Sequence, residues 1–249
     1  IFFDKSKELI ISVDTYVEGT HFINFKKPEL IIKKILRSSI SDLICKGVKP
    51  KYYFLSASGN SKSFSKNSLK KISNSLSSEQ KRFDIELSGG DTVFSKTSSF
   101  TCCVIGFSNK IIKRNNAKID DDIYITGYLG DSYLGLQILK KKISSSNPFK
   151  KYFISKFYMP SINLKMVNFL KKFANTSIDI SDGLLIDLKK MTRQQKCGFS
   201  IKIDDIKISA QLKKFLSRNK RFKIENTIFN GDDYEIILFF SLSTITGLS

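Results

Sequence analysis

The sequence has 249 residues, a formal net charge of +19, 41% hydrophobic residues and 12% aromatic residues. This apolar content excludes a disordered chain, and no apolar run approaches the roughly 18 residues that a membrane-spanning helix needs. The Lys and Arg residues are spread along the whole chain, and no zinc-finger spacing or RNP-type aromatic motif is present, so we expect no membrane partner and no dedicated nucleic-acid partner.

The four cysteines indicate a reducing compartment. Cys45, Cys102, Cys103 and Cys197 form no Cys-x-x-Cys pair, and buried reduced thiols of a cytoplasmic protein are the expectation. No signal-peptide pattern is present, and the chain begins at Ile1 without an initiator Met, so we expect it to be a piece of a longer protein.

Apolar residues recur with the periods of strands and helices along the first 110 residues. Strands at 1–3 and 8–13 are expected to form a hairpin, and further strands are expected at 52–58, 84–87 and 99–107. Pro28 opens a predicted helix that reaches Leu43, with Gly47 and Pro50 as stop signals, and a second helix is predicted over 69–82. Residues 110–122 carry charge and few apolar side chains, so the domain boundary is placed there.

The second half continues the alternation of strands and helices. The predicted strands lie at 123–126, 198–203 and 236–240, and the predicted helices lie at 134–139, 162–173 and 210–217, with a polar break at 140–146. This pattern predicts an α/β (α+β) protein in two lobes, with residues 1–110 in the smaller lobe and 115–249 in the larger.

One stretch stands out, Ser177-Ile-Asp-Ile-Ser-Asp-Gly-Leu-Leu-Ile-Asp-Leu188. A short strand through Ile178 and Ile180 leads into a helix whose apolar positions recur at helical spacing, with Ser181 and Asp182 as the predicted cap. Carboxylates beside a helix N-terminus suit a metal-bridged nucleotide, because Mg²⁺ prefers hard oxygens and phosphates prefer exposed backbone N–H groups. The alternative is that Ser181 and Asp182 only cap the helix while Asp179 faces water.

Four other places deliver Asp at or beside a Gly-containing break, at Asp14, Asp42, Asp91 and the pair Asp232 and Asp233. If these carboxylates converge, they imply a multi-magnesium centre that holds a triphosphate. Four more aspartates have no motif around them and are expected to be surface residues, namely Asp120, Asp121, Asp187 and Asp204.

Six segments in order resemble the thiamine-monophosphate kinase family, within the superfamily typified by aminoimidazole ribonucleotide synthetase. They are Asp14-Thr-Tyr-Val-Glu-Gly-Thr-His-Phe22, Ser41-Asp-Leu-Ile-Cys-Lys-Gly-Val-Lys-Pro50, Gly89-Gly-Asp-Thr92, Thr126-Gly-Tyr-Leu-Gly-Asp-Ser132, Ile178-Asp-Ile-Ser-Asp-Gly-Leu184 and Gly231-Asp-Asp-Tyr-Glu235. The first segment favours this family over its relatives. The resemblance implies transfer of the γ-phosphate of ATP to thiamine monophosphate by direct in-line attack at a magnesium centre.

The resemblance also implies roles for individual residues. The implied metal ligands are Ser12, Asp14, Asp42, Asp91, Asp179 and Asp182, of which Asp91 and Asp182 are the implied catalytic residues. The implied ATP contacts are Gly90, Asp91, Arg114 and Ser181, and the implied thiamine monophosphate contacts are His21 and Asp232. Without the resemblance, His21 is an ordinary loop histidine and Arg114 a solvated linker residue.

The resemblance further implies a homodimer built by pairing the sheets of the smaller lobes, a larger lobe with helices packed on a mixed sheet, and ATP between the lobes. The chain departs from the family pattern: it starts after the family's Gly-Asp-Asp segment and stops before its C-terminal region. Val13 stands where Ser or Thr is common, and Asp232 replaces the usual Glu. The rivals are selenophosphate synthetase-, hydrogenase maturation- or purine synthetase-like enzymes and, from another class, a basic nucleic-acid-binding module.

Overall fold

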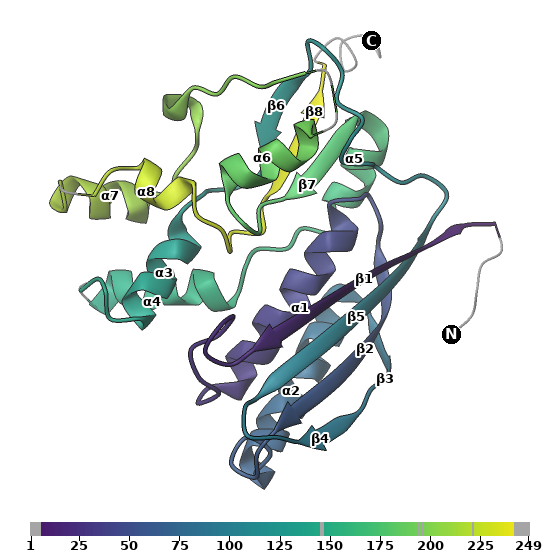
Figure 1. Cartoon of the computed structure of the whole chain (residues 1–249), viewed down its shortest axis with the longest axis vertical. Helices are drawn as coiled ribbons and strands as arrows, with labels where there is room; N and C mark the ends of the chain where they lie inside the picture. Colours follow the sequence, from purple (N-terminus) through teal and green to yellow (C-terminus); the bar gives the residue numbers. More distant parts are fainter. Residues whose placement is uncertain (1–5, 145–146, 194, 196, 221, 242–249) are drawn as a thin grey trace. The chain divides into compact units, whose positions relative to one another are not determined.

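We analysed a computed structural model, which describes residues 6–144, 147–193, 195, 197–220 and 222–241. The chain divides into two compact units. The first unit comprises residues 1–44 and 48–110, and the second comprises 45–47 and 111–249. Each unit combines a sheet with helices, so the predicted α/β class is confirmed (Figure 1). No helix of the described residues is long and apolar enough to cross a membrane.

The first unit is a sheet with two helices on one face (Figure 1). The strand order is β1-β5-β2-β3, and β4 also pairs with β2. The bounds are β1 Glu8–Val17, β2 Pro50–Gly59, β3 Glu86–Gly89, β4 Thr92–Phe94, β5 Ser99–Ser108, α1 Pro28–Ile44 and α2 Lys66–Phe83. β1, β5 and β2 pair antiparallel, whereas β3 and β4 run parallel to β2, so this sheet is mixed.

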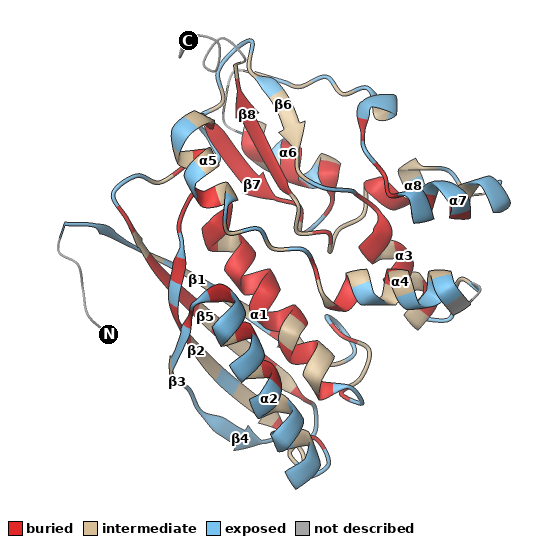
Figure 2. Ribbon diagram, turned by 180° about the vertical axis from the view of Figure 1, so that it is seen from behind, coloured by how far each residue is buried: buried red, intermediate tan, exposed pale blue. Residues whose placement is uncertain are grey.

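Alternation along β1 separates the two faces of this sheet. Tyr16 points to the helix-covered face and is buried, whereas Leu9, Ile11 and Val13 point to the other face and are 42%, 52% and 58% exposed. Figure 2 shows that most of α1 is buried, whereas α2 has an exposed outer face. The first unit therefore leaves one apolar sheet face uncovered by its own helices.

The second unit has the strand order β6-β8-β7 with both pairings antiparallel, where a mixed sheet was expected. The bounds are β6 Asp122–Ile125, β7 Thr176–Asp179, β8 Ile236–Phe240, α3 Asp131–Leu139, α4 Asn147–Tyr158, α5 Met166–Phe173, α6 Leu184–Thr192, α7 Ala210–Arg218 and α8 Glu225–Ile228. Side chains from these helices and strands share one apolar core, which includes Leu134, Phe153, Leu188, Leu212 and Ile237.

Many predicted elements lie within one or two residues of their expected ends, but four boundaries were misplaced by three or four residues: β1 extends to Val17, α2 begins at Lys66, α3 begins at Asp131 and α5 begins only at Met166. The predicted strand at 198–203 is wrong: Phe199 and Ile201 do pack on the core, but this stretch pairs with no described strand. Helix α4 was not predicted, although its apolar residues Phe149, Phe153 and Phe157 recur every four positions. The expected strand at 1–3 lies outside the described residues.

Candidate active site

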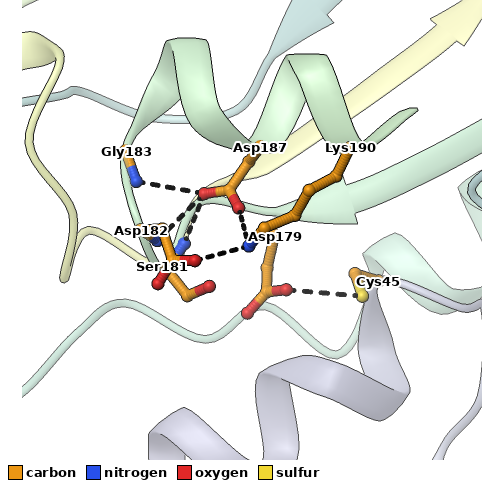
Figure 3. A network of polar contacts seen from close by, with 7 residues as sticks. All are labelled: Cys45, Asp179, Ser181, Asp182, Gly183, Asp187 and Lys190. Atoms are coloured by element: carbon orange, nitrogen blue, oxygen red, sulfur yellow. Dashed lines mark hydrogen bonds and ion pairs between the residues drawn. The ribbon is translucent and has the colours of Figure 1, made fainter. Parts of the chain in front are cut away.

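In the second unit, the first residue of the candidate site is Asp179, the last residue of β7. This carboxylate is 4% exposed, and the Cys45 thiol lies 3.8 Å from its Oδ1 (Figure 3). The Ser177 hydroxyl donates to the Cys45 carbonyl, which ties this short connecting segment to β7. All four cysteines are free, as predicted, but only Cys45 and Cys102 are buried, whereas Cys103 and Cys197 are half-buried. The alternative in which Asp179 simply faces water is therefore wrong.

The turn between β7 and α6 is held by a carboxylate from inside the helix. Asp187 Oδ2 accepts hydrogen bonds from the N–H groups of Ser181, Asp182 and Gly183 at 3.0, 3.0 and 3.1 Å (Figure 3). The predicted cap is thus wrong: the N-cap is Gly183, and it makes no side-chain capping bond. The expectation of exposed backbone N–H groups at this turn fails for the same reason, because Asp187 occupies these three.

Asp187 was expected at the surface, and this is also wrong, since it is fully buried. The sequence did carry a signal. Asp187 lies three residues after Leu184 and four before Met191, so helical periodicity places it on the apolar face of α6. A carboxylate there must find hydrogen-bond donors, and the turn at its own helix N-terminus supplies them.

Lys190 completes this network. Its Nζ lies 2.6 Å from Asp187 Oδ1 and 2.6 Å from Asp182 Oδ2, so one ammonium group bridges the two carboxylates (Figure 3). Burial acts to lower the pKa of Lys190, but the hydrogen bonds and charges of Asp182 and Asp187 outweigh it and the pKa is raised. No sequence motif pointed to Lys190, so this role was not predicted.

The segment before β8 packs directly on this turn. The Asp232 N–H donates to the Ser181 carbonyl at 3.0 Å, and the Tyr234 N–H donates to the Ile180 carbonyl at 2.9 Å. A Cβ atom on Gly231 would collide with the backbone of Ser181 and Asp182, so only glycine permits this approach. The structure thus brings Ser181 and Asp182 beside Asp232, although about 50 residues separate them in the sequence.

A second group of carboxylates comprises Asp131, Asp233 and Glu235. None of these three has a cationic partner at hydrogen-bond distance among the described residues. Asp233 accepts the Gly130 N–H at 2.9 Å, and Glu235 accepts the Thr126 hydroxyl at 2.5 Å. Asp131 accepts hydrogen bonds from Tyr152 and Ser209, both at 2.7 Å. Burial raises the pKa of all three carboxyl groups, that of Asp233 well above its usual range.

Arg114 lines a cationic cavity of about 600 Å³ in the second unit. Its other basic residues are Lys46, Lys113, Lys190 and Arg193, and none of its described lining residues is a carboxylate. Lys190 therefore faces this cavity while its ammonium holds Asp182 and Asp187. Such an accumulation of positive charge in one concave site suits a polyanion.

The first unit holds a separate group of predicted metal ligands on the helix-covered face of its sheet. The Ser12 hydroxyl donates to Asp42 Oδ2 at 2.5 Å, which joins β1 to α1. The Tyr16 hydroxyl lies 3.2 Å from Asp14 Oδ2 and 3.2 Å from the Ser39 hydroxyl. Burial, with Asp14 as a smaller cause, raises the pKa of Tyr16, so this phenol stays protonated as a donor. Ser12 and Asp42 are therefore in contact, and Asp14 lies two residues farther along the same face of β1.

The remaining predicted residues of the first unit lie apart from that group. Gly90 and Asp91 form the turn between β3 and β4, where the Asp91 carbonyl accepts the Ala57 N–H at 2.8 Å. Strands β5 and β2 lie between Asp91 and Asp14. His21 is exposed in the turn after β1, and its Nδ1 accepts the Val17 N–H at 3.0 Å. The proton of a neutral His21 ring must then sit on Nε2, which presents a donor.

Within the described part of the chain, no group of three or more His, Cys, Asp or Glu side chains lies close enough to hold a metal ion by itself. The donors are nevertheless hard carboxylate and hydroxyl oxygens, and the Lys190 ammonium already serves as a counter-cation at Asp182. Mg²⁺ is commonly held by one or two carboxylates together with substrate phosphates and water. The residues therefore fit magnesium that arrives with a nucleotide.

Comparison with known proteins gives consistent matches. Residues 1–108 match the family model described as AIR synthase related protein, N-terminal domain. A thiamine-monophosphate kinase of Buchnera aphidicola (subsp. Acyrthosiphon pisum) is 37% identical over 249 residues, covering 98% of this chain and 75% of the relative. The solved structure of AaThiL complexed with AMPPCP and TMP has a TM-score of 0.90 at 25% identity, covering 98% of this chain and 78% of the other. The crystal structure of thiamine monophosphate kinase from Aquifex aeolicus has a TM-score of 0.89 at 25% identity, covering 96% of this chain and 82% of the other.

Proposed function

The chain belongs to the thiamine-monophosphate kinase family, and we propose that it transfers the γ-phosphate of ATP to the phosphate of thiamine monophosphate, giving thiamine diphosphate. The observation that carries this proposal is the pairing of the Asp179–Gly183 turn with the Gly231–Glu235 segment. That contact places Ser181 and Asp182, which are implied to bind ATP and metal, beside Asp232, which is implied to bind thiamine monophosphate. A solved relative is described with both an ATP analogue and TMP.

The chemistry of the acceptor explains why no dedicated base is needed. A phosphate oxygen of thiamine monophosphate is already ionised near neutral pH, so the enzyme need not remove a proton from it. What remains is to hold donor and acceptor in line and to balance the negative charge of two phosphate groups. The cationic cavity at Arg114 supplies positive charge for the ATP phosphates, and Gly90, Asp91 and Ser181 are the further ATP contacts that we propose.

We propose that magnesium ions are held by two sets of oxygen donors. Ser12, Asp14, Asp42 and Asp91 are the donors of the first unit, and Asp179 and Asp182 are those of the second. Bound magnesium would neutralise the charge that the phosphoryl oxygens carry during transfer. In the absence of the metal, Lys190 balances the charge of Asp182.

The proposed contacts to thiamine monophosphate are His21 and Asp232. The Nδ1 bond to Val17 fixes the His21 ring, so that its Nε2–H is the group free to donate toward a phosphate. Asp232 adopts a positive φ of 73° and is held at its backbone by Ser181, which sets the direction of its side chain. The four free cysteines agree with the cytoplasm, which is the compartment that we propose.

We also propose that two copies pair through the uncovered face of the first sheet. Leu9, Ile11 and Val13 form an exposed apolar row on β1, and the strand register places the exposed Val93 of β4 on the same face of the sheet. Sedimentation should give a dimer for the natural chain and a monomer for Ile11→Lys. An unchanged dimer in Ile11→Lys would refute pairing through this face.

The test of the activity is thiamine diphosphate production by the purified chain with ATP, magnesium and thiamine monophosphate. Asp91→Asn should abolish magnesium-dependent ATP binding, whereas His21→Ala should raise the KM for thiamine monophosphate and leave ATP binding unchanged. Turnover of ATP with another acceptor but not with this one would favour a different enzyme of the superfamily. Steeply salt-dependent binding to RNA or DNA without ATP binding would favour the basic nucleic-acid module instead.

A further inference from the structure

Asp187 is a fully buried carboxylate at the centre of the candidate site, and the proposed reaction gives it no role. We propose that Asp187 is a positioning residue that fixes the Ser181–Gly183 turn and thereby presents the Asp182 carboxylate and the Ser181 side chain to nucleotide and metal. The inference rests on the proposed function for the identity of the ligand, but the positioning itself is a property of the unliganded chain.

The two oxygens of Asp187 have different tasks. Oδ2 takes the three consecutive N–H groups of the turn, and Oδ1 takes the Lys190 ammonium, which in turn holds Asp182 (Figure 3). Hydrogen bonds to an ionised acceptor are stronger than neutral ones, and a buried carboxylate with these partners has little freedom to move. One side chain thus restrains both the backbone and the carboxylate of Asp182.

The arrangement also decides how the turn can meet a phosphate. The N–H groups of Ser181, Asp182 and Gly183 already donate to Asp187, so a nucleotide phosphate gains no hydrogen bond from them. The turn can therefore offer a phosphate only the Ser181 hydroxyl, which can donate directly, and the Asp182 carboxylate, which meets a phosphate only through an intervening cation. Because Asp187 occupies the three N–H groups, Asp182 depends on a cation to take part in nucleotide binding.

The same turn links the two substrate-binding segments. Both sides of Ser181 are held, because its N–H donates to Asp187 and its carbonyl accepts the Asp232 N–H. Loosening the Asp187 bonds would therefore disturb the proposed nucleotide contact and the proposed acceptor contact together.

The first experiment measures amide hydrogen exchange at residues 181–183 by NMR, without any ligand. In the natural chain these three amides should exchange as slowly as the interior amides of α6, and fast exchange would overturn the proposal with no variant needed. In Asp187→Asn the carboxylate charge is lost, and exchange at these amides should rise at least about tenfold. Lys190→Met should leave their exchange within about twofold of the natural rate, because Oδ2 keeps its three bonds.

The second experiment measures Mn²⁺ binding by electron paramagnetic resonance, with Mn²⁺ and ADP as the probes, at a temperature where every variant is fully folded. Asp187→Asn should bind Mn²⁺ about 10- to 100-fold more weakly, as expected for the loss of a group that orients a ligand. Asp204→Asn, the same change at an exposed position of the second unit, is the matched control and should bind as the natural chain does.

Equal Mn²⁺ affinity in Asp187→Asn and Asp204→Asn would overturn the positioning role, whatever the effect on thermal stability. Failure of the proposed function is distinguishable. If the chain does not phosphorylate thiamine monophosphate, the hydrogen-exchange experiment still tests the positioning role of Asp187, because it involves neither ATP nor the acceptor.

Discussion

Two groups of buried carboxylates in the second unit use opposite means to tolerate burial. Asp187 receives backbone N–H groups and the Lys190 ammonium, so its environment supplies positive charge. Asp131, Asp233 and Glu235 receive only hydroxyl and backbone N–H donors from the described residues. Burial raises the pKa of each and outweighs the charge of Lys156, which acts to lower the pKa of Asp131 and Glu235. The two groups therefore differ in the charge of the groups around them and not in burial alone.

The two groups also hold different loops. The Asp187 group restrains the turn that carries Asp182, whereas Asp233 and Glu235 restrain the turn from Thr126 to Ser132. The first group carries charge beside the proposed metal site, whereas the second group holds backbone segments together. The first unit contains a buried ion pair between α1 and α2. Neither residue of this pair is proposed to bind a ligand, so substitutions there report on the buried charge alone.

The largest effect is expected at that pair. Arg37 and Glu79 are both buried, with Nε–Oε2 at 2.7 Å and a second bond from the guanidinium to Oε1 at 3.0 Å. Arg37→Met leaves the Glu79 charge buried without its cation and should lower the free energy of unfolding by about 3–5 kcal/mol, measured by urea denaturation. The double variant Arg37→Met/Glu79→Leu should recover most of the loss. A double variant as unstable as the single one would show that the charge is not the cause.

The next effect is expected at Gly183, whose φ of 125° allows the turn to reach Asp187. A Cβ atom there would collide with the Phe229 carbonyl, so Gly183→Ala should lower the free energy of unfolding by about 2–3 kcal/mol. The matched control is Gly198→Ala, because a Cβ at Gly198 meets nothing within 4 Å. Equal stability of the two variants, measured by thermal unfolding, would contradict the close packing of this turn.

The smallest effect is a pH dependence from the second carboxylate group. A carboxyl group with a raised pKa binds more protons in the folded than in the unfolded state, so the free energy of unfolding falls as pH rises. The fall should begin near pH 4, the unfolded pKa, and reach at most about 1.4 kcal/mol per pH unit for each group.

Asp233→Asn removes the group with the largest rise in pKa and should make this fall shallower. The exposed change Asp204→Asn should leave the slope unchanged. Urea denaturation at a series of pH values between 4 and 7 measures both. An equally steep fall in Asp233→Asn would mean that Asp233 is ionised in the folded protein across this range.

The amino-acid sequence by itself determined the fold class and most of the elements, because apolar periodicity records which face of each element is buried. The strand at 236–240 and the helix that begins at Pro28 were predictable in this way. The acidic segments were also visible, because each combines Asp with Gly at the end of an apolar run. The resemblance of those segments to one kinase family carried the functional expectation.

Only the tertiary structure decided which polar groups meet. Asp233 bonds Gly130 across 103 residues of sequence, and Ser181 meets Asp232 through a backbone contact that no local pattern encodes. Helical periodicity places Asp187 on the apolar face of α6, so its burial was predictable. Its partners were not, because they are N–H groups that the turn presents only once it is folded. Periodicity reports whether a residue is buried, whereas the donors and cations around a buried carboxylate come from segments that the fold brings together.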